Sequence, residues 1–490
     1  MSFVNAMDNH SKITFTENGM RAVNSTDSYL LDLFVNIGNM RQNSPVEVEN
    51  AIAKAFNEDP KMTIKVAFYA RDIRGGIGER RNGLAMFRYL AENCPDVMRK
   101  NIKFIPEYGR WDDLYALIDT PIEKDMWAFI ANQLSEDMEN SKAGKPISLC
   151  AKWLKSAEKC SKKTNALGTK TRIALSLNAK QYRKMLSRLR KYIDVTERKM
   201  CAKDWEGIEY KKVPSYAMNN YRKAFYRHDE SRFSDYIASV QKGETKINSS
   251  TLYPYNLTEK YMKNGGWGIP TKDPVVEAQW KALPNYIDGE HNVVVIADTS
   301  GSMYGRPIYA AIGLALYFAQ RNRGEFHGRY MTFSSRPSWV KVQDGSSLRD
   351  NCVAAYNVDW GGSTNIQRAM QMILDICVSN HLKQEDVPKA LVIISDLQFD
   401  CVSSVDTTYF KTIQKMYSDV GYVAPNIVFW NASEYSRNTH HASALDKYVQ
   451  MYSGYSASIF KQVISSIDKT PYQAMMDTLN SERYQPIVIE

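Results

Sequence analysis

Hydrophobic positions recur with helical spacing through the first part of the chain. A helix is predicted to begin near Ser25-Thr26-Asp27, a second at Pro45, and a third to contain Ile64, Phe68 and Ile73. We expect Gly75-Gly76 to end the third helix by adopting positive φ, before a further helix that includes residues 84–91. The same spacing predicts helices at residues 96–104, 111–118, 121–138, 147–159, 170–176 and 178–192. Paired helices without a strict sequence repeat are typical of an α-solenoid.

From Asn292 onwards the pattern changes to short apolar runs that alternate with helical stretches. Strands are predicted at residues 293–297, 329–333, 339–342, 390–395 and 426–430, with a further one at 447–451. Helices are predicted at residues 308–320, 366–378, 405–417 and 456–467, followed by a helix and a short strand within 470–490. This alternation predicts a largely parallel sheet with helices on both faces.

The expected fold class is therefore α plus α/β, with a helical region ahead of a doubly wound domain. We divide the 490 residues into an arm (1–25), a helical-repeat region (26–203), a helical or irregular connection (204–289) and an α/β domain (290–490). The composition, 44% hydrophobic and 24% charged, is that of an ordinary globular chain. Seven cysteines without a CxxC motif fit a reducing, cytoplasmic setting. The chain has no run of 18 consecutive apolar residues, so we predict no membrane span.

Positive charge is concentrated in one segment of the chain. Residues 141–227 contain 23 Lys/Arg and 6 Asp/Glu, whereas the whole chain carries a net charge of only +9. A localised basic surface indicates a polyanionic partner such as RNA, although a solvated helical surface is the alternative interpretation. The cations expected to contact RNA phosphates are Lys152, Lys155, Lys162, Lys163, Lys170, Arg172, Arg183, Lys184 and Arg188.

Two other stretches leave their interpretation open. Between residues 204 and 284, tyrosines alternate with Lys and Arg, so they either stack on unpaired bases or pin the connection against the helices, which we favour. Within residues 71–81, Asp72 and Glu79 either fix a helix hairpin by pairing with nearby arginines, or leave those arginines to contact phosphate.

Oxygen-bearing side chains follow the ends of two predicted buried strands. Asp298, Ser300 and Ser302 come directly after residues 293–297, and Asp396 comes after 390–395. A Gly-rich turn containing Thr364 opens the helix between them. Because parallel strands end at the same sheet edge, we expect these five side chains to surround one Mg²⁺, with Mn²⁺ or Ca²⁺ as substitutes. Ser363 is an alternative to Thr364, and an ion that serves only local order is an alternative to a functional one.

The DxSxS…T…D arrangement resembles the metal-ion-dependent adhesion site (MIDAS) of von Willebrand factor A (vWA) domains. An order of helices first and vWA last resembles the TROVE-module Ro autoantigen family, whose ring of HEAT-like repeats is closed by a vWA domain and binds RNA. The chain is more closely similar to an uncharacterised vWA family found in phages and plants. The stretches that carry this resemblance are residues 16–34, 69–81, 105–114, 151–156, 182–190, 212–218, 224–229, 295–303, 361–365 and 428–431.

Three functions are weighed against each other. The first is a Ro-like protein that holds single-stranded or structured non-coding RNA on its basic helices, with a Mg²⁺-bearing vWA module for partner docking. The second is a vWA scaffold that binds an acidic residue of a protein partner without RNA. The third is a metal-dependent phosphodiesterase, which we do not expect because no second-metal cluster is visible, and His291 and His327 lack a partner base or nucleophile. No catalytic residue is therefore assigned.

Overall fold

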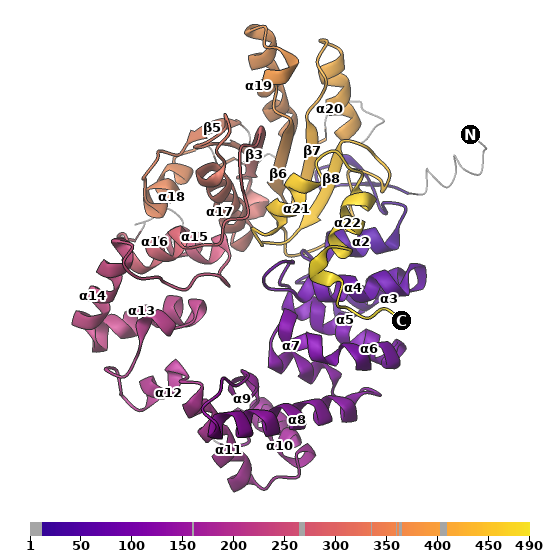
Figure 1. Cartoon of the computed structure of the whole chain (residues 1–490). Coiled ribbons are helices and arrows are strands. Elements are labelled where there is room, and N and C mark those ends of the chain that lie inside the picture. The colour runs from indigo at the N-terminus through magenta and orange to yellow at the C-terminus, as the bar shows by residue number, and fades with distance from the viewer. Residues whose placement is uncertain are drawn as a thin grey trace.

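Helices predominate between Tyr29 and Lys281, and an α/β domain follows (Figure 1). The structure is a computed structural model that describes residues 12–158, 161–263, 270–334, 336–358, 360–361, 365–401 and 409–490. The α plus α/β fold class expected from the sequence is confirmed.

The helices ahead of the sheet are α2 (Tyr29–Asn36), α3 (Pro45–Glu58), α4 (Pro60–Arg71), α5 (Arg80–Asn93), α6 (Pro95–Asn101), α7 (Ile105–Tyr108), α8 (Glu123–Lys142), α9 (Cys150–Trp153), α10 (Lys162–Ala174), α11 (Ala179–Tyr192), α12 (Thr196–Cys201), α13 (Ser215–His228), α14 (Glu230–Gln241), α15 (Pro254–Met262) and α16 (Pro274–Lys281). Short 3₁₀ helices are η1 (Ile102–Phe104), η2 (Trp111–Leu117) and η3 (Tyr210–Lys212) in this region, and η4 (Gly301–Met303), η5 (Gln384–Asp386) and η6 (Glu482–Tyr484) further on.

Local sequence signals place most of these helices. Helix α3 starts at Pro45 behind a capping box, in which the Ser44 hydroxyl accepts from the Glu47 N–H and the Glu47 carboxylate accepts from the Ser44 N–H. Its buried positions, Val48 and Ile52, are those that the helical spacing predicts. Helix α11 likewise begins behind a capping box and buries its predicted apolar face.

Several predicted helices differ from the structure: residues 111–117 form the 3₁₀ helix η2, and the helix predicted at 170–176 is α10, which begins at Lys162. Helix α4 ends at Arg71, so Ile73 lies outside it, and the glycine with left-handed backbone is Gly78 (φ +70°) rather than Gly75 or Gly76. The helix predicted at 147–159 is reduced to α9, because the guanidinium of Arg190 binds the carbonyls of Ala151 and Leu154 where the chain turns away.

A six-stranded sheet forms the centre of the C-terminal part. Its strands are β3 (Val293–Asp298), β4 (Arg329–Phe333), β5 (Ser338–Lys341), β6 (Ala390–Ser395), β7 (Asn426–Asn431) and β8 (Val449–Ser453). Their order is β5-β4-β3-β6-β7-β8, and all neighbours are parallel except β4 and β5. Strands β3 and β6 are buried along their whole length, as their unbroken apolar runs predict.

Helices surround this sheet, mostly as the alternation of the sequence predicts. They are α17 (Arg306–Arg321), α18 (Leu348–Tyr356), α19 (Ile366–Ser379), α20 (Tyr409–Ser418), α21 (Ile459–Ser465) and α22 (Pro471–Leu479). The predicted start of the 405–417 helix lies outside the described residues. The short strand predicted near the C-terminus is wrong, since residues 485–490 form none and instead pack along the helical region, where the Asn101 side chain bonds both backbone groups of Val488.

The helical region and the α/β domain together form a closed ring (Figure 1). At one junction α2 contacts β8 and α22, and α4 contacts α22 and η6. At the other junction α15 contacts α17 and α18. Most buried apolar residues join one continuous core across both parts, whereas residues 208–247, with Val275 and Ala278, form a smaller separate core.

Residues 12–24 form an arm that lies against the α/β domain. Strands β1 (Ile13–Phe15) and β2 (Arg21–Val23) pair antiparallel, a hairpin that the weak patterning of this region does not predict. The turn between them binds the chain that follows β6: the Thr16 hydroxyl donates to the Phe399 carbonyl at 2.8 Å, and Gly19 pairs with Asp400. The described part of the arm is thereby fixed beside the sheet edge where Asp396 lies.

Candidate metal centre and basic cavity

The two predicted carboxylates meet at the carboxyl edge of the central strands. Asp298 is the last residue of β3, and Asp396 follows β6, the strand next to it. The chain leaves these two strands in opposite directions across the sheet, to β4 and to β7, which creates the crevice where α/β folds bind ligands. Asp298 is completely buried, and Asp396 is 5% exposed.

Hydrogen bonds tie the loop after β3 to both carboxylates. The Asp298 carboxylate accepts from the Ser300 N–H at 2.8 Å and from the hydroxyl of Ser395. The hydroxyls of Ser300 and Ser302 lie 3.1 Å apart, and Ser302 bonds Asp396. Four of the five predicted metal-binding residues are thus brought together, while Thr364 and its alternative Ser363 lie outside the described residues.

The charges of this centre are poorly compensated by the protein. Burial, together with the negative charge of Asp396, raises the pKa of Asp298 to about 7. Burial also raises the pKa of Asp396, although hydrogen bonds from Ser302 and Gln398 and the charge of Arg437 oppose this. Arg437 forms its ion pair with Glu17 of the N-terminal arm, not with either aspartate.

The donor set fits a hard divalent cation. Two carboxylates and two hydroxyls offer only oxygen, which Mg²⁺, Mn²⁺ and Ca²⁺ prefer, and a cation would offset the buried negative charge. Among the residues that the structure describes, no group of three or more His, Cys, Asp or Glu side chains forms a metal site. An ion bound here would have Asp298 and Asp396 as carboxylate ligands, with hydroxyls or water completing its shell.

The two histidines near the sheet both have ordinary structural contacts. The ring of His291 bonds the Asp288 carbonyl at 2.8 Å. The ring of His327 lies between the Asn322 carbonyl and the Asp344 carboxylate, and the hydrogen bond to Asp344 and that to Asn322 raise its pKa. The Asp344 carboxylate is thus a partner of His327 that we did not expect from the sequence, whereas His291 contacts a backbone carbonyl.

A large cavity occupies the middle of the ring, bounded by α9, α11, α12, α13 and the turns after α4 and α7. Its volume is about 1310 Å³. Two glutamates, Glu158 and Glu197, line it together with eight cations. These cations are Arg71, Arg74, Arg80, Arg110, Lys152, Arg183, Arg190 and Arg198. Aromatic side chains on the wall are Trp153, Tyr182, Tyr216, Tyr221 and Tyr253.

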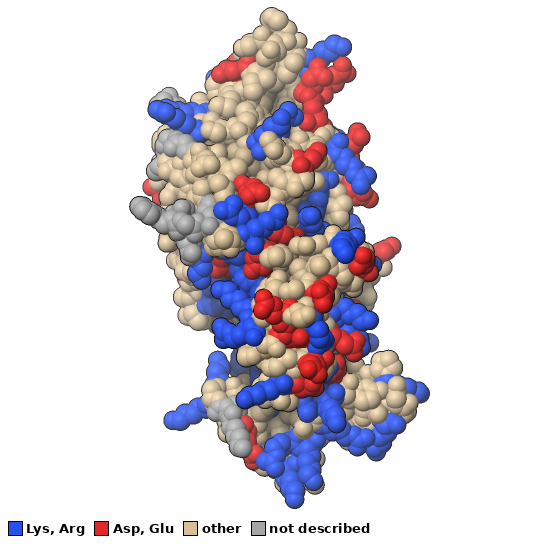
Figure 2. Space-filling view, turned by 90° about the vertical axis from the view of Figure 1, so that its left-hand side faces the viewer, with Lys and Arg blue, Asp and Glu red and all other residues tan. Residues whose placement is uncertain are grey.

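Of the nine cations predicted from charge alone, only Lys152 and Arg183 line this cavity. Three others are engaged within the protein: Lys155 pairs with Asp112, Lys170 pairs with Asp119 and Glu123, and Arg172 binds the Leu177 carbonyl. The remaining four, which lie on the outer surface of α10 and α11, are exposed: Lys162, Lys163, Lys184 and Arg188. Helices α10 and α11 lie at the lower end of the molecule in Figure 1, and Figure 2 shows Lys and Arg gathered toward that end.

Six cavity arginines were missed because they come from other segments or were not singled out. Arg71, Arg74, Arg80 and Arg110 lie outside the basic segment 141–227, so only closure of the ring brings them together with it. The one signal was the 71–81 stretch, where phosphate contact was an open alternative. The other interpretation, pairing with nearby arginines, is wrong in its partners, because Asp72 and Glu79 pair with distant arginines, Arg483 and Arg41. Phosphate contact by Arg71 and Arg80, which line the cavity, stays a prediction.

The tyrosines between residues 204 and 284 lie in two environments, and their stacking on unpaired bases stays a prediction. Tyr210 packs with Phe225 and Phe233 in the small core, whereas Tyr216 and Tyr221 line the cavity.

In the described part of the chain, no helix is both long and apolar enough to cross a bilayer.

The fold and these sites define a ring-shaped protein of helices and one α/β domain, with a basic cavity and an oxygen-rich carboxylate centre. Residues 16–129 and 159–290, which together make up half of the chain, match the family described as a domain of unknown function (DUF2828), and the chain belongs to this family. Residues 292–484 match a second domain of unknown function (DUF7788). The uncharacterized protein L728 of Acanthamoeba polyphaga mimivirus is 29% identical over 523 residues, covering 98% of this chain and 89% of the relative. None of these matches carries the name of the Ro family, so that resemblance stays a prediction.

Proposed function

We propose that the protein binds RNA, single-stranded or structured and non-coding, with its central cavity and the basic helices around it. The observation that carries this proposal is the cavity wall, where eight Lys and Arg face two Glu. Such an excess of positive charge inside a closed ring favours a polyanion, and its binding is expected to weaken as salt rises.

RNA fits this wall better than a small anion does. The cavity exceeds the roughly 300–1,000 Å³ of ordinary small-molecule pockets. Aromatic side chains such as Trp153, Tyr216 and Tyr221 alternate with the cations, as in surfaces that stack unpaired bases and hold the phosphates between them. Recognition of unpaired segments and shape is also the usual way that proteins bind RNA.

For the rest of the architecture we propose a HEAT-like helical region and a vWA-like C-terminal domain with a MIDAS. Asp298, Ser300, Ser302 and Asp396 would hold Mg²⁺ together with Thr364. Bound there, the ion would supply an electrophilic position for a carboxylate of a protein partner.

One observation favours partner docking at this edge as a second function. Tyr304, directly after the Ser300–Ser302 loop, is 87% exposed, which makes it a ready apolar contact beside the ion. In the alternative hypothesis this docking is the whole function and RNA is not bound. An Asp298→Ala variant would then lose its protein partner in a pull-down, and wild-type protein would show no RNA binding.

The RNA proposal is tested with two variants that each remove four positive charges. The cavity variant replaces Arg74, Lys152, Arg183 and Arg198 by Gln, and the outer variant replaces Lys162, Lys163, Lys184 and Arg188 by Gln. In a filter-binding assay at fixed salt, the cavity variant is expected to bind RNA at least tenfold more weakly than wild type. The outer variant is expected to lose less RNA affinity, because its four substitutions weaken only the overall positive potential of the protein.

Each other outcome has a definite meaning. If the outer variant loses more than the cavity variant, RNA binds on the outside of α10 and α11 and the cavity proposal is wrong. If wild-type protein binds no RNA at low salt, the function itself is wrong. Catalysis is not proposed, and RNA that stays intact with the protein in Mg²⁺ or Mn²⁺ would agree with that.

A further inference from the structure

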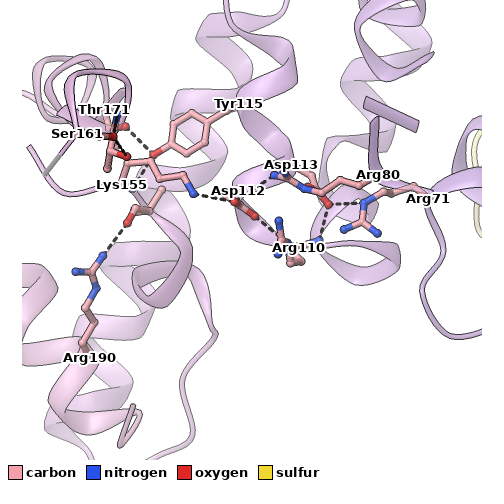
Figure 3. A network of polar contacts seen from close by, with 12 residues as sticks. Arg71, Arg80, Arg110, Asp112, Asp113, Tyr115, Lys155, Ser161, Thr171 and Arg190 are labelled. Carbon is pink, nitrogen blue, oxygen red and sulfur yellow. Dashed lines mark hydrogen bonds and ion pairs between the residues drawn. The ribbon is translucent and has the colours of Figure 1, made fainter. Parts of the chain in front are cut away.

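A cluster of four cations, three of which line the cavity, shares only two carboxylates (Figure 3). Asp113 accepts from the Nε atoms of Arg71 at 2.7 Å and Arg80 at 2.8 Å. Asp112 pairs with Lys155 at 2.8 Å, with Arg110 at 3.1 Å and with Arg80 at 3.2 Å. Both aspartates are buried.

This cluster therefore carries two positive charges more than it can neutralise. Among the described residues, none of these four cations forms an ion pair with any carboxylate other than Asp112 and Asp113. Burial lowers the pKa of Arg110, and the charges of Arg80 and Arg71 add to that effect although Asp112 opposes it. Arg71 is buried, whereas the side chains of Arg80 and Arg110 are 43% and 29% exposed, so an anion that enters the cavity can reach the unpaired positive charge.

The cluster is built with close packing. A Cβ atom on Gly109 would lie 2.3 Å from Asp113 Oδ2 and 3.0 Å from Arg71 Nε, so the backbone there presses directly against the ion pair. The Arg110 guanidinium lies 4.3 Å from the centre of the Trp153 ring, which holds it flat on the cavity wall. The donors are thus positioned before any ligand arrives, which reduces the entropy lost on binding.

We propose that this cluster, formed by Arg71, Arg80, Arg110 and Lys155 around Asp112 and Asp113, receives the terminal phosphate of a bound RNA. This inference rests on the proposed function. A phosphomonoester carries a charge of about −1.5 to −2 at pH 7, which matches the excess of two. An internal phosphodiester carries one negative charge and leaves half of the excess unpaired.

A free mononucleotide offers the same phosphomonoester, yet the rest of the wall favours an RNA end. Arg183 of α11 and Arg198 of α12 line the same cavity, as does Tyr221. These side chains continue the run of cations and aromatic rings away from the cluster, and a mononucleotide has no further phosphates to reach them.

The experiment compares three forms of one short RNA, internally labelled, in fluorescence anisotropy with wild-type protein. One form carries a 5′-phosphate, one a 3′-phosphate and one hydroxyls at both ends. One phosphorylated form is expected to bind at least tenfold more tightly than the dihydroxyl form. Its affinity should also fall more steeply with salt, by about 1.4 in the slope of log K against log salt for two further charges.

The alternatives separate this inference from the proposed function. Equal binding of all three forms would remove the phosphate site but leave RNA binding intact. Failure of every form to bind would remove the proposed function itself. If a 5′-mononucleotide competes as well as the phosphorylated RNA, the site serves free nucleotides and the assignment to an RNA end is wrong.

Single substitutions then test whether this cluster causes the preference for phosphorylated RNA. Arg110→Gln and, separately, Arg80→Gln are expected to reduce the preference for phosphorylated RNA to less than twofold, with a smaller effect on the dihydroxyl form. Arg323→Gln makes the same charge change at an exposed position of the α/β domain outside the cavity wall, and should keep the preference. Thermal unfolding checks that each variant folds. If both cluster variants fold and keep the tenfold preference, the cluster is not the phosphate site.

Discussion

Arg483 binds Asp72 through two parallel hydrogen bonds, 2.7 Å and 2.8 Å long, across 411 positions of sequence. Asp72 is completely buried at the end of α4, and Arg483 lies in η6 near the C-terminus. The Tyr484 hydroxyl donates to the same carboxylate at 3.1 Å. Hydrogen bonding to Asp72 raises the pKa of Arg483. This ion pair fastens the last residues of the protein to the helical side of the ring.

Replacing Arg483 by Ala should therefore destabilise the whole protein. Asp72 would remain buried without its cation, and breaking such a pair costs about 3 kcal/mol in the free energy of unfolding. Denaturant unfolding measures this loss. As a control, Arg99→Gln removes an exposed arginine that pairs with Asp96 and Asp125, and should cost less than about 1 kcal/mol. Equal losses in the two variants would contradict the role of the Asp72 pair.

Removal of the Asp298 charge should have opposite effects on the stability of the metal-free protein and on its stabilisation by Mg²⁺. In the absence of divalent ions, Asp298→Asn is expected to unfold at or above the wild-type temperature, because it removes a buried charge that Asp396 repels. Mg²⁺ at 100 times its Kd should stabilise the wild type by about 2.7 kcal/mol and leave the variant unchanged. Thermal unfolding with Mg²⁺ or EDTA measures both effects. A variant that responds to Mg²⁺ as the wild type does would place the ion elsewhere.

Stability should fall at mildly acidic pH because of His441. This side chain is completely buried beside Phe399 and Phe429, and burial lowers its pKa to about 4. An unfolded chain takes up the proton near the ordinary value of 6.5, so the neutral native form contributes stability above that pH. This contribution is lost as the pH falls from 6.5 towards 4, by about 3 kcal/mol.

The measurement is the free energy of unfolding of wild type and His441→Gln between pH 7 and pH 4.5. Gln keeps a donor for the Leu397 carbonyl, which His441 Nε2 contacts at 3.0 Å, but it does not titrate. The variant should show a shallower pH dependence than wild type. Parallel curves would mean that other groups cause the loss at acidic pH.

The sequence predicts best what depends on neighbours along the chain. The apolar runs of β3 and β6 locate the sheet core, and their ends bring Asp298 and Asp396 together, because parallel strands fix which residues share an edge. The capping box at Ser44 likewise fixes the start of α3.

Features that depend on distant partners were not predictable in this way. The break after α9 follows from Arg190 binding the carbonyls of Ala151 and Leu154, and helical spacing contains no sign of it. The arm shows weak patterning, yet Thr16 is buried because the loop after β6 covers it. The cavity arginines gather for the same reason: Arg71 and Arg190 lie far apart in sequence and meet only around the closed ring.

The way in which the ring is fastened also affects how the protein is made. Asp72 is synthesised 411 positions before Arg483, and Asn101 is synthesised 387 positions before the Val488 backbone that it binds. Until those later residues emerge from the ribosome, the first helices have a carboxylate and an amide side chain that lack their final partners. Assembly of the N-terminal helices is thus expected to finish only once residues 483–488 are available, and chains truncated before residue 483 should be more sensitive to protease.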